Sequence, residues 1–419
     1  MDQKIVEKYE QAKKVYARYG VDVDKVLSEF EKIPVSLQCW AGDDVKGFEG
    51  LGPVASENVV TGSYPYIARN GDELREDIDE AFSFSPLKHK VNLHSMYAEH
   101  HHPRNDLTFE DFREWITWAK AKGYGLDFNT SFFTHPMMNH GMSCACLDKT
   151  TRDYWIKAGL DSRKISVAIG KELGQKCYNN FWFPDGMKDL PANRRMYREL
   201  LEDSLNQMFK VPYTAEESRY AEDLLEGKWF GISTEAFVVG SHEFYIGYAA
   251  KHNLGVTLDM GHFRPSEDVY DKISAIYPFV NGMMLHVSRG IHWDSDHVVI
   301  EDDALTNMML ELKRGDYYGK VAIGLDYFDA SISRVYGWVI GLRAAAKAIL
   351  YSLLEPTELI QNAEKKGDFG TRLLYMEDFH NLPYNDVWEY LLAKKGIASG
   401  EEMDKALRAY EKNVQMKRK

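Results

Sequence analysis

Eight short apolar runs, separated by amphipathic segments, are the feature that most limits the folds open to this 419-residue chain. A typical segment between two runs is "TFEDFREWITWAKAKG" at 108–123, where apolar residues recur every three or four positions, as on one face of a helix. Strands that alternate with helices form parallel sheets. The runs that we predict as strands lie at 35–40, 90–97, 125–129, 179–184, 223–227, 255–260, 282–287 and 320–326.

This alternation predicts an α/β fold closed into a (β/α)8 TIM barrel, the simplest arrangement of eight parallel strands at this length. The barrel, with a helical N-terminal segment at 1–33, is expected to occupy residues 1–353. Residues 354–419 are rich in helix formers and are predicted to form a helical extension. That extension is expected to pack either on the barrel or on a neighbouring subunit.

Charge and cysteine content exclude several classes of protein. The chain has 51 basic and 64 acidic residues, and its net charge of -13 argues against a nucleic-acid or anionic-membrane partner. Its four cysteines lack the spacing of a disulfide framework or a four-cysteine zinc module, which favours a reducing compartment. The charged N-terminus is expected to contain no apolar core of signal-peptide length, and no apolar stretch is expected to reach the length of a membrane span. We therefore expect a cytoplasmic protein that acts on a small molecule.

Two aspartates stand one residue apart in "LHVSRGIHWDSDH", at 285–297. In an extended segment, residues i and i+2 point to the same side, so Asp294 and Asp296 would direct two carboxylates at one place. Like charges held together raise each other's pKa unless a cation or strong donors lie between them. Taken alone, the motif is more often a pair of solvated loop aspartates than a metal site.

Similar residues end other predicted strands. The segment "LLEGKW" places Glu226 and Lys228 at the end of the fifth strand, and Gly261 in "TLDMGHFRP" allows a turn that brings His262 beside Asp259. The last two strands carry His286 and Asp326. The carboxyl ends of barrel strands five to eight are neighbours on one rim, where the catalytic residues of this fold gather.

Together these residues predict a metal centre. Five carboxylates and two imidazoles on one arc carry too much negative charge for a dry site, and a pair of divalent cations would balance it. Mixed oxygen and imidazole ligands suit Mn2+, Co2+, Mg2+ or Zn2+. Singly, His286 is better explained as a core histidine, and Asp259 or Asp326 as a helix cap. The joint arrangement favours the metal interpretation.

Other candidates have simpler explanations. Glu235 in "TEAFVVGSHEFY" is an alternative fifth-strand ligand or the start of a helix. The consecutive His100, His101 and His102 do not converge on one ion, so a solvated loop is expected. Cys144 and Cys146 are expected to be ordinary thiols. Trp182 offers a flat face that could stack on a sugar or belong to the core. The chain contains no P-loop, dinucleotide-binding glycine motif or nucleophile elbow.

Several motifs resemble those of the L-rhamnose isomerase family, and the resemblance extends over essentially the whole chain. The stretches that carry it are "QCWAGDDVKGFE", "GLDFNTSFFTHP", "FWFPDGMKD", "TLDMGHF", "HVSRGIHWDSDHV" and "IGLDYFDASISR". More distantly, the E-x-K, acid-x-x-His and D-x-D motifs are similar to those of xylose isomerase. Asp259 stands where that relative has a glutamate, and His286 where it has an acid, so both positions keep a ligand.

The resemblance implies a (β/α)8 barrel, usually in homotetramers, with two divalent metal ions per subunit, commonly Mn2+. Its implied structural-metal ligands are Glu226, Asp259, His286 and Asp326. Its implied catalytic-metal ligands are His262, Asp294 and Asp296, with Asp259 as a candidate bridge. Lys228 matches the lysine of the E-x-K motif. Trp182 matches a tryptophan that lines the sugar site, and His94 is a candidate ring-opening residue.

The reaction implied by the resemblance is the interconversion of L-rhamnose and L-rhamnulose, the first step of L-rhamnose catabolism. A dense metal site favours a 1,2-hydride shift, and proton transfer through an enediol is the competing route. Two other functions are compatible with the residues. One is a different metal-dependent barrel enzyme, an aldolase or a phosphodiester hydrolase, and the other is a non-catalytic sugar- or metal-binding protein.

Overall fold

The barrel predicted from the apolar runs is confirmed. The computed structural model describes residues 1–51, 64–100, 102–229, 236–264, 266–291, 296–327 and 329–418. Within these ranges, eight parallel strands close into a barrel in which each strand pairs with the next one along the chain, and the last pairs with the first. The barrel strands are β1(Pro34–Gln38), β2(Lys88–His94), β3(Gly125–Asn129), β4(Cys177–Trp182), β6(Ala221–Glu226), β8(Gly255–Asp259), β9(Met283–Val287) and β10(Val321–Leu325).

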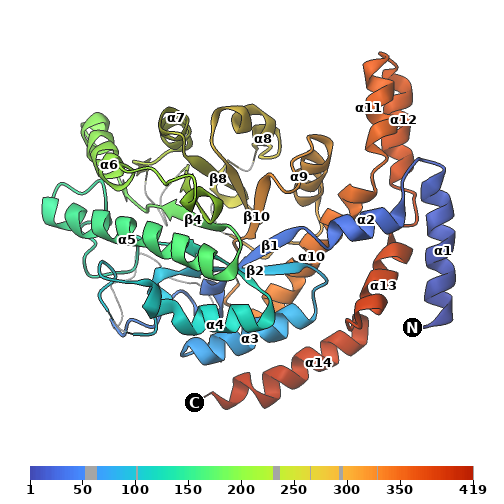
Figure 1. Cartoon of the computed structure of the whole chain (residues 1–419), viewed down its shortest axis with the longest axis horizontal. Coiled ribbons are helices and arrows are strands. Elements are labelled where there is room, and N and C mark those ends of the chain that lie inside the picture. Colours follow the sequence, from blue (N-terminus) through green and yellow to red (C-terminus); the bar gives the residue numbers. More distant parts are fainter. Residues whose placement is uncertain are drawn as a thin grey trace.

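Helices surround the barrel, as the alternating pattern requires (Figure 1). They begin with good caps: Asn70, Asp148 and Asp302 each accept a hydrogen bond from a backbone N–H in the first turn of their helix. The helices that follow the strands are α3(Gly71–Ser83), α4(Arg113–Lys122), α5(Lys149–Leu173), α6(Arg194–Met208), α7(His242–His252), α8(Asp271–Ile276), α9(Asp303–Arg314) and α10(Arg334–Leu354).

The strand register brings the predicted site residues to one end of the barrel. Trp182 is paired with Glu226 across β4 and β6, and Asp259 with His286 across β8 and β9. Because all eight strands are parallel, their carboxyl ends share a rim. A small antiparallel sheet of β5(Gly186–Met187) and β7(Phe237–Val238) was not predicted. Each of its strands has two residues, too few to give a period-2 pattern.

Helices at both ends of the chain pack against each other beside the barrel (Figure 1). Tyr9 on α1(Gln3–Ala17) stacks on Tyr390 of α13(Tyr384–Lys395), with ring centroids 3.7 Å apart. Val387 and Leu391 on α13 are fully buried. The remaining terminal helices are α2(Val23–Phe30), α11(Thr357–Lys365), α12(Phe369–Phe379) and α14(Gly400–Asn413). The division of the chain at residue 353 and a contact with a neighbouring subunit stay predictions.

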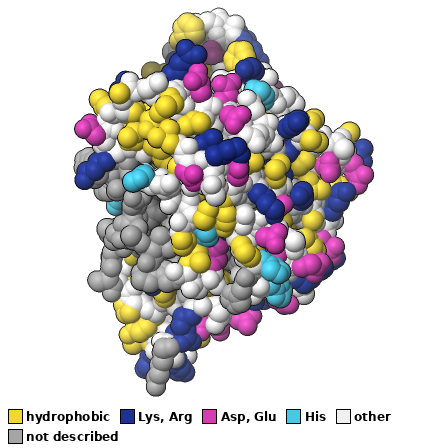
Figure 2. Space-filling model, turned by 90° about the vertical axis from the view of Figure 1, so that its left-hand side faces the viewer, with side chains coloured by type: hydrophobic (Ala, Val, Ile, Leu, Met, Phe, Trp, Pro, Cys, Tyr) yellow, Lys and Arg dark blue, Asp and Glu magenta, His cyan; other side chains and the backbone are white. Residues whose placement is uncertain are grey.

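The sequence was expected to contain no apolar stretch of membrane-spanning length, but one described helix, α10, is long and apolar enough to span a membrane by length and composition alone. Within the protein, 83% of its apolar window is buried, as expected of a core helix in a barrel. Charged side chains of both signs are interspersed on the face shown in Figure 2. The described residues of that face form no continuous basic stripe of the kind that follows a phosphate backbone.

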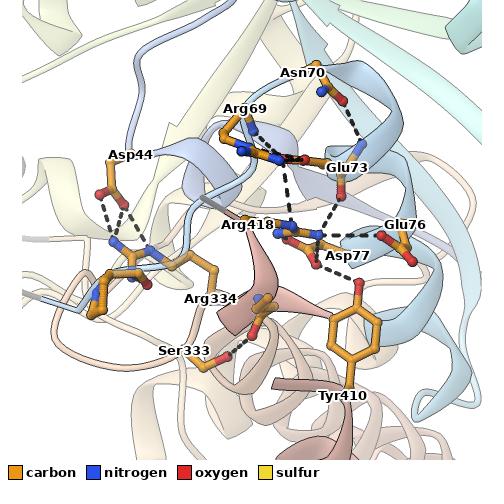
Figure 3. Close-up of polar contacts among 12 residues, drawn as sticks. Asp44, Arg69, Asn70, Glu73, Glu76, Asp77, Ser333, Arg334, Tyr410 and Arg418 are labelled. Atoms are coloured by element: carbon orange, nitrogen blue, oxygen red, sulfur yellow. Dashed lines mark hydrogen bonds and ion pairs between the residues drawn. The ribbon is translucent and has the colours of Figure 1, made fainter. Parts of the chain in front are cut away.

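The C-terminal residues are tied to α3 by a buried ion pair (Figure 3). The Arg418 guanidinium donates to both carboxylate oxygens of Asp77, at 2.6 and 2.8 Å, and the Tyr410 hydroxyl donates to the same carboxylate. Gln415, 1% exposed, accepts a hydrogen bond from the Ser333 hydroxyl at the start of α10. The last residues therefore join the extension to two barrel helices.

Replacing Arg418 by alanine is expected to lower the free energy of unfolding by about 1–3 kcal/mol. The Asp77 carboxylate would lose its cation, but the chain end can move away and admit water, which limits the loss. The measurement is urea unfolding followed by circular dichroism. Arg408→Ala is the control, because its pair with Asp404 is exposed, and its effect is expected to stay below about 1 kcal/mol. Equal effects of the two substitutions would contradict this account.

Candidate active site

Four predicted ligands from four adjacent strands converge at the barrel rim. One ligand atom from each of Glu226, Asp259, His286 and Asp326 lies within 4.8 Å of the corresponding atoms of the others. His286 Nδ1 is 3.3 Å from Glu226 Oε2 and 3.2 Å from Asp326 Oδ2. The first three side chains are at most 3% exposed, and Asp326 is partly buried. These four residues are the structural-metal ligands that the family resemblance implies.

A second group shares Asp259 with the first. One ligand atom from each of Asp259, His262 and Asp296 also lies within 4.8 Å of the others. His262 Nδ1 is 3.0 Å from Glu226 Oε1, and its Nε2 is 3.9 Å from Asp259 Oδ2, so this ring lies between the two groups. Asp294, the other aspartate predicted for this group, lies outside the described residues.

Gly261 permits the close approach of two segments at the second group. A Cβ at this position would lie 2.5 Å from Asp296 Oδ1 and 2.8 Å from Ser288 Oγ, both too close for a side chain. The turn predicted at this glycine forms as the 3-10 helix Met260–His262, but the φ of Gly261 is outside the left-handed region. Its contribution is the space that it leaves for the Asp296 carboxylate. Asp296 itself has a φ of +36°, a strained value that is typical of functional sites.

The donor set fits divalent cations. Asp259 Oδ2 and Asp326 Oδ1 are buried and accept no hydrogen bond from any residue that the structure describes. A buried carboxylate oxygen without a donor is costly unless a cation lies beside it. Oxygen and imidazole ligands are those that Mn2+, Mg2+, Co2+ and Zn2+ accept. These residues can hold a divalent metal.

Electrostatics within the first group reflect its excess of negative charge. Burial by itself would raise the pKa of Glu226, but the charges of His286 and His262 hold that pKa well below its usual value. Burial would lower the pKa of His286, and the carboxylates of Glu226 and Asp326 raise it well above its usual value instead. Burial raises the pKa of Asp259 to about 7. The site therefore attracts positive charge, which a metal ion would supply in place of protons.

Lys228 and Trp182 lie next to the second group. The Lys228 side chain is 4% exposed, and its Nζ lies 4.8 Å from the Trp182 ring centroid. The Trp182 ring centroid is 6.3 Å from that of His262, and Phe133 packs edge-on against Trp182 at 5.3 Å. A buried cation and an aromatic wall thus border the ligands. Phe133 was not singled out from the sequence, where it is one of two adjacent phenylalanines in an apolar stretch.

His94, the last residue of β2, is held on both ring nitrogens. Its Nε2 is 2.8 Å from Gln38 Oε1, and its Nδ1 is 3.3 Å from Ser131 Oγ. Burial, with a smaller effect of His286, lowers the pKa of His94 to about 3, so the ring is neutral. Gln38 also lies 3.5 Å from His286, through its Nε2. His94 is therefore connected to the first ligand group by one side chain.

Several polar residues that support the ligands were missed from the sequence. Asn180 donates a hydrogen bond from Nδ2 to Glu226 Oε2 and accepts one from the Thr257 hydroxyl at 2.7 Å. Ser288 donates to Asp259 Oδ1 at 3.0 Å. Asn180 and Thr257 are polar residues inside buried strands, the same signal that identified Asp259. Applied to every strand, that signal would have found them and Gln38.

The remaining sequence candidates lie away from these groups or outside the described residues. His102 pairs with Asp111 at 2.6 Å and is half-exposed, as a loop histidine would be. The four cysteines are free and buried, as expected of ordinary thiols. His101 and Glu235, the alternative fifth-strand ligand, lie outside the described residues. Glu226, the preferred ligand, is the last residue of β6 and belongs to the first group.

Comparisons with known proteins identify the family. The sequence model of the family described as L-rhamnose isomerase (RhaA) matches residues 3–418. An L-rhamnose isomerase from Rhodopirellula baltica is 46% identical over 409 residues, 97% of this chain and 95% of that protein. One from Listeria innocua is 43% identical over 99% of both chains. One from Lactiplantibacillus plantarum is 43% identical over 98% of this chain and 96% of that protein.

One matching solved structure is much more distant in sequence. This structure, of an L-ribulose 3-epimerase, is 10% identical, has a TM-score of 0.47 and covers 79% of this chain and 96% of its own. Similarity at this level supports no conclusion about function. The family model and the relatives above each span nearly the full length of the chain. The chain therefore belongs to the L-rhamnose isomerase family.

Proposed function

We propose that this protein interconverts L-rhamnose and L-rhamnulose with the help of two divalent metal ions, most naturally Mn2+. The observation that carries this proposal is the pair of ligand groups that share Asp259 at the barrel rim, in a chain of this family. Glu226, Asp259, His286 and Asp326 would hold one ion. Asp259, His262, Asp294 and Asp296 would hold the other. Bound there, the ions would polarise the sugar carbonyl and stabilise the neighbouring hydroxyl as an alkoxide.

The chain's own residues would position the sugar and shield it. Lys228, buried beside Trp182, would place a positive charge near the oxygen that becomes negative as the carbonyl is reduced. The faces of Trp182 and Phe133 would cover the apolar edge of the sugar and its methyl group. Such an enclosure is compatible with transfer of hydrogen from carbon to carbon as hydride, because that route needs neither water nor a base to remove a proton from carbon, whereas an enediol route needs a base.

The proposal is tested by removing and restoring metal. Chelator-treated protein is expected to form no L-rhamnulose from L-rhamnose, and added Mn2+ is expected to restore turnover, with Co2+, Mg2+ and Zn2+ compared alongside. The reaction run in D2O separates the two routes, since a hydride shift leaves deuterium out of C1 of L-rhamnulose. Product formation by fully metal-free protein would contradict the proposed role of the metals. No ketose with any metal would leave a sugar- or metal-binding protein.

Metal binding is expected to release protons near neutral pH. In the metal-free protein, burial raises the pKa of Asp259, and nearby carboxylates raise that of His286 against the effect of burial. Both groups then hold protons that a metal must displace, so metal affinity should fall as pH falls through 7. Calorimetric titration with Mn2+ in two buffers of different ionisation enthalpy measures this release. Identical heats in both buffers would argue against it, and Asp259→Asn should release fewer protons.

The setting of the enzyme is part of the same proposal. We infer a cytoplasmic homotetramer that performs the first step of L-rhamnose catabolism, since the family implies this assembly and role. Light scattering of the purified protein would test the tetramer, and a dimer or monomer would contradict it.

A further inference from the structure

Gln38 lies within hydrogen-bonding distance of both the imidazole of the ligand His286 and the His94 imidazole. It ends β1, and in the barrel it lies between β2, which carries His94, and β10. His286 belongs to β9, one strand further away. All three side chains are at most 3% exposed, so water does not compete freely for their hydrogen bonds.

The His286 side chain on β9 can extend past β10 to Gln38 on β1 because residue 324 is a glycine. Gly324 is paired with His286 across β10 and β9. A Cβ on residue 324 would lie 3.2 Å from His286 Cδ2, the ring carbon next to Nε2, and 2.6 Å from the Met284 side chain. Without that Cβ, the ring passes β10 and brings its Nε2 to 3.5 Å from the Gln38 amide. The fold therefore places the amide between two imidazoles whose strands, β9 and β2, are separated in the barrel by β10 and β1.

An amide has one end that only accepts hydrogen bonds and one that only donates. Gln38 must therefore present opposite ends to His286 and His94. If Nδ1 of His286 holds a metal, the proton of this ring is on Nε2, and it needs an acceptor. Gln38 Oε1 is the acceptor that a half-turn of the amide would supply. The amide nitrogen would then donate to His94 Nε2, which must be unprotonated, and the His94 proton would lie on Nδ1, facing Ser131 Oγ.

We propose that Gln38 is a positioning residue that couples the metal ligand His286 to His94, so that the proton on Nε2 of His286 determines which nitrogen of His94 carries its proton. This inference rests on the proposed metal site. His94 neither gains nor loses a proton in the process, in keeping with its neutral state in the fold. The consequence is that His94 meets the sugar site as a fixed tautomer, with the lone pair of Nε2 directed at Gln38.

The test is neutron diffraction from deuterated crystals of the Mn2+-loaded protein. We expect deuterium on Nδ1 of His94 and on Nε2 of His286, with the Gln38 amide oxygen facing His286. In Gln38→Glu, the carboxylate accepts from both rings, so the deuterium of His94 is expected to move to Nε2 while Mn2+ stays bound. In Gln38→Met, neither ring is oriented, and calorimetry is expected to show Mn2+ affinity lower by about 10- to 100-fold.

Three results would overturn the inference: deuterium on Nε2 of His94 in the loaded wild-type protein, an unchanged His94 tautomer in Gln38→Glu, or Mn2+ bound without contact to His286 Nδ1. The failure of the proposed function has a different signature. Loaded protein that shows the expected deuterium positions but forms no L-rhamnulose would reject the isomerase activity and leave the coupling intact.

Discussion

Replacing Asp259 by asparagine is expected to lower kcat/KM for L-rhamnose by at least about a hundredfold, because loss of even an outer partner of a metal ligand costs 10- to 100-fold. Asp259 belongs to both ligand groups, so its loss is expected to weaken the binding of both proposed metal ions. The substitution spares the fold. Oδ1 accepts hydrogen bonds from the Gly261 N–H at 2.7 Å and the Ser288 hydroxyl at 3.0 Å, and an amide oxygen can accept both. The amide NH2 would replace Oδ2, the oxygen without a described donor.

Thermal unfolding with and without Mn2+ separates lost metal binding from lost stability. Asparagine removes a buried charge from the metal-free protein, so the melting temperature without metal is expected to stay equal or rise. Mn2+ is expected to raise the melting temperature of the variant by less than it raises that of the wild type. A ligand stabilises a protein only to the extent that it binds the native state. Asp368→Asn is the control, since this exposed N-cap of α12 works equally well as an amide. Asp259→Asn with turnover within threefold of wild type would contradict the shared-ligand role.

Most of the eight barrel strands could be predicted because they contain short buried apolar runs, and β6, AEDLLE, was the hardest to predict because three of its six residues are acidic. A short apolar run between helical segments can be recognised from neighbouring residues alone, and it indicates a buried strand. The ligands could be predicted for a related reason. Asp259, His286 and Glu226 are polar residues in or at the end of such runs, and the fold rule for barrels places those ends together.

What escaped prediction depends on contacts between distant parts of the chain. The partner of Asp77 is Arg418, 341 residues away, and both look like ordinary charges in amphipathic segments. The value of Gly261 and Gly324 is the space they leave for side chains of other segments, which no local pattern records. Gln38 was visible as a polar residue in a buried run, but its two partners lie on β2 and β9. Sequence patterns thus predicted positions on the rim, and the structure added which rim residues touch.

A second ion pair lies inside the barrel wall, away from the ligand groups. Lys90 Nζ is 2.5 Å from Asp127 Oδ1, and the side chains are 6% and 1% exposed. The ammonium also donates to the Lys176 carbonyl at 2.9 Å, and Asp127 accepts from the Tyr178 N–H at 2.8 Å. Strands β2, β3 and β4 are therefore joined by one buried network. Its members were not singled out from the sequence, where Lys90 simply begins a predicted strand.

Lys90→Met is expected to lower the free energy of unfolding by about 3–5 kcal/mol, because it leaves the Asp127 carboxylate buried without a cation. The double variant Lys90→Met/Asp127→Asn is expected to recover much of this loss, since no uncompensated charge remains and the amide still accepts from Tyr178. Urea unfolding of wild type, both single variants and the double variant measures the coupling between the two positions.

Lys120→Met is the matched control for this cycle. Its ammonium pairs with Glu172 at 2.8 Å, but the two side chains are 60% and 41% exposed, so the expected loss is below about 1 kcal/mol. Water already surrounds that pair and replaces whichever partner is removed. Burial, and not the ion pair as such, is thus the variable that the comparison isolates. A double variant less stable than either single variant would mean that the buried pair stabilises the barrel beyond the cost of leaving one charge alone.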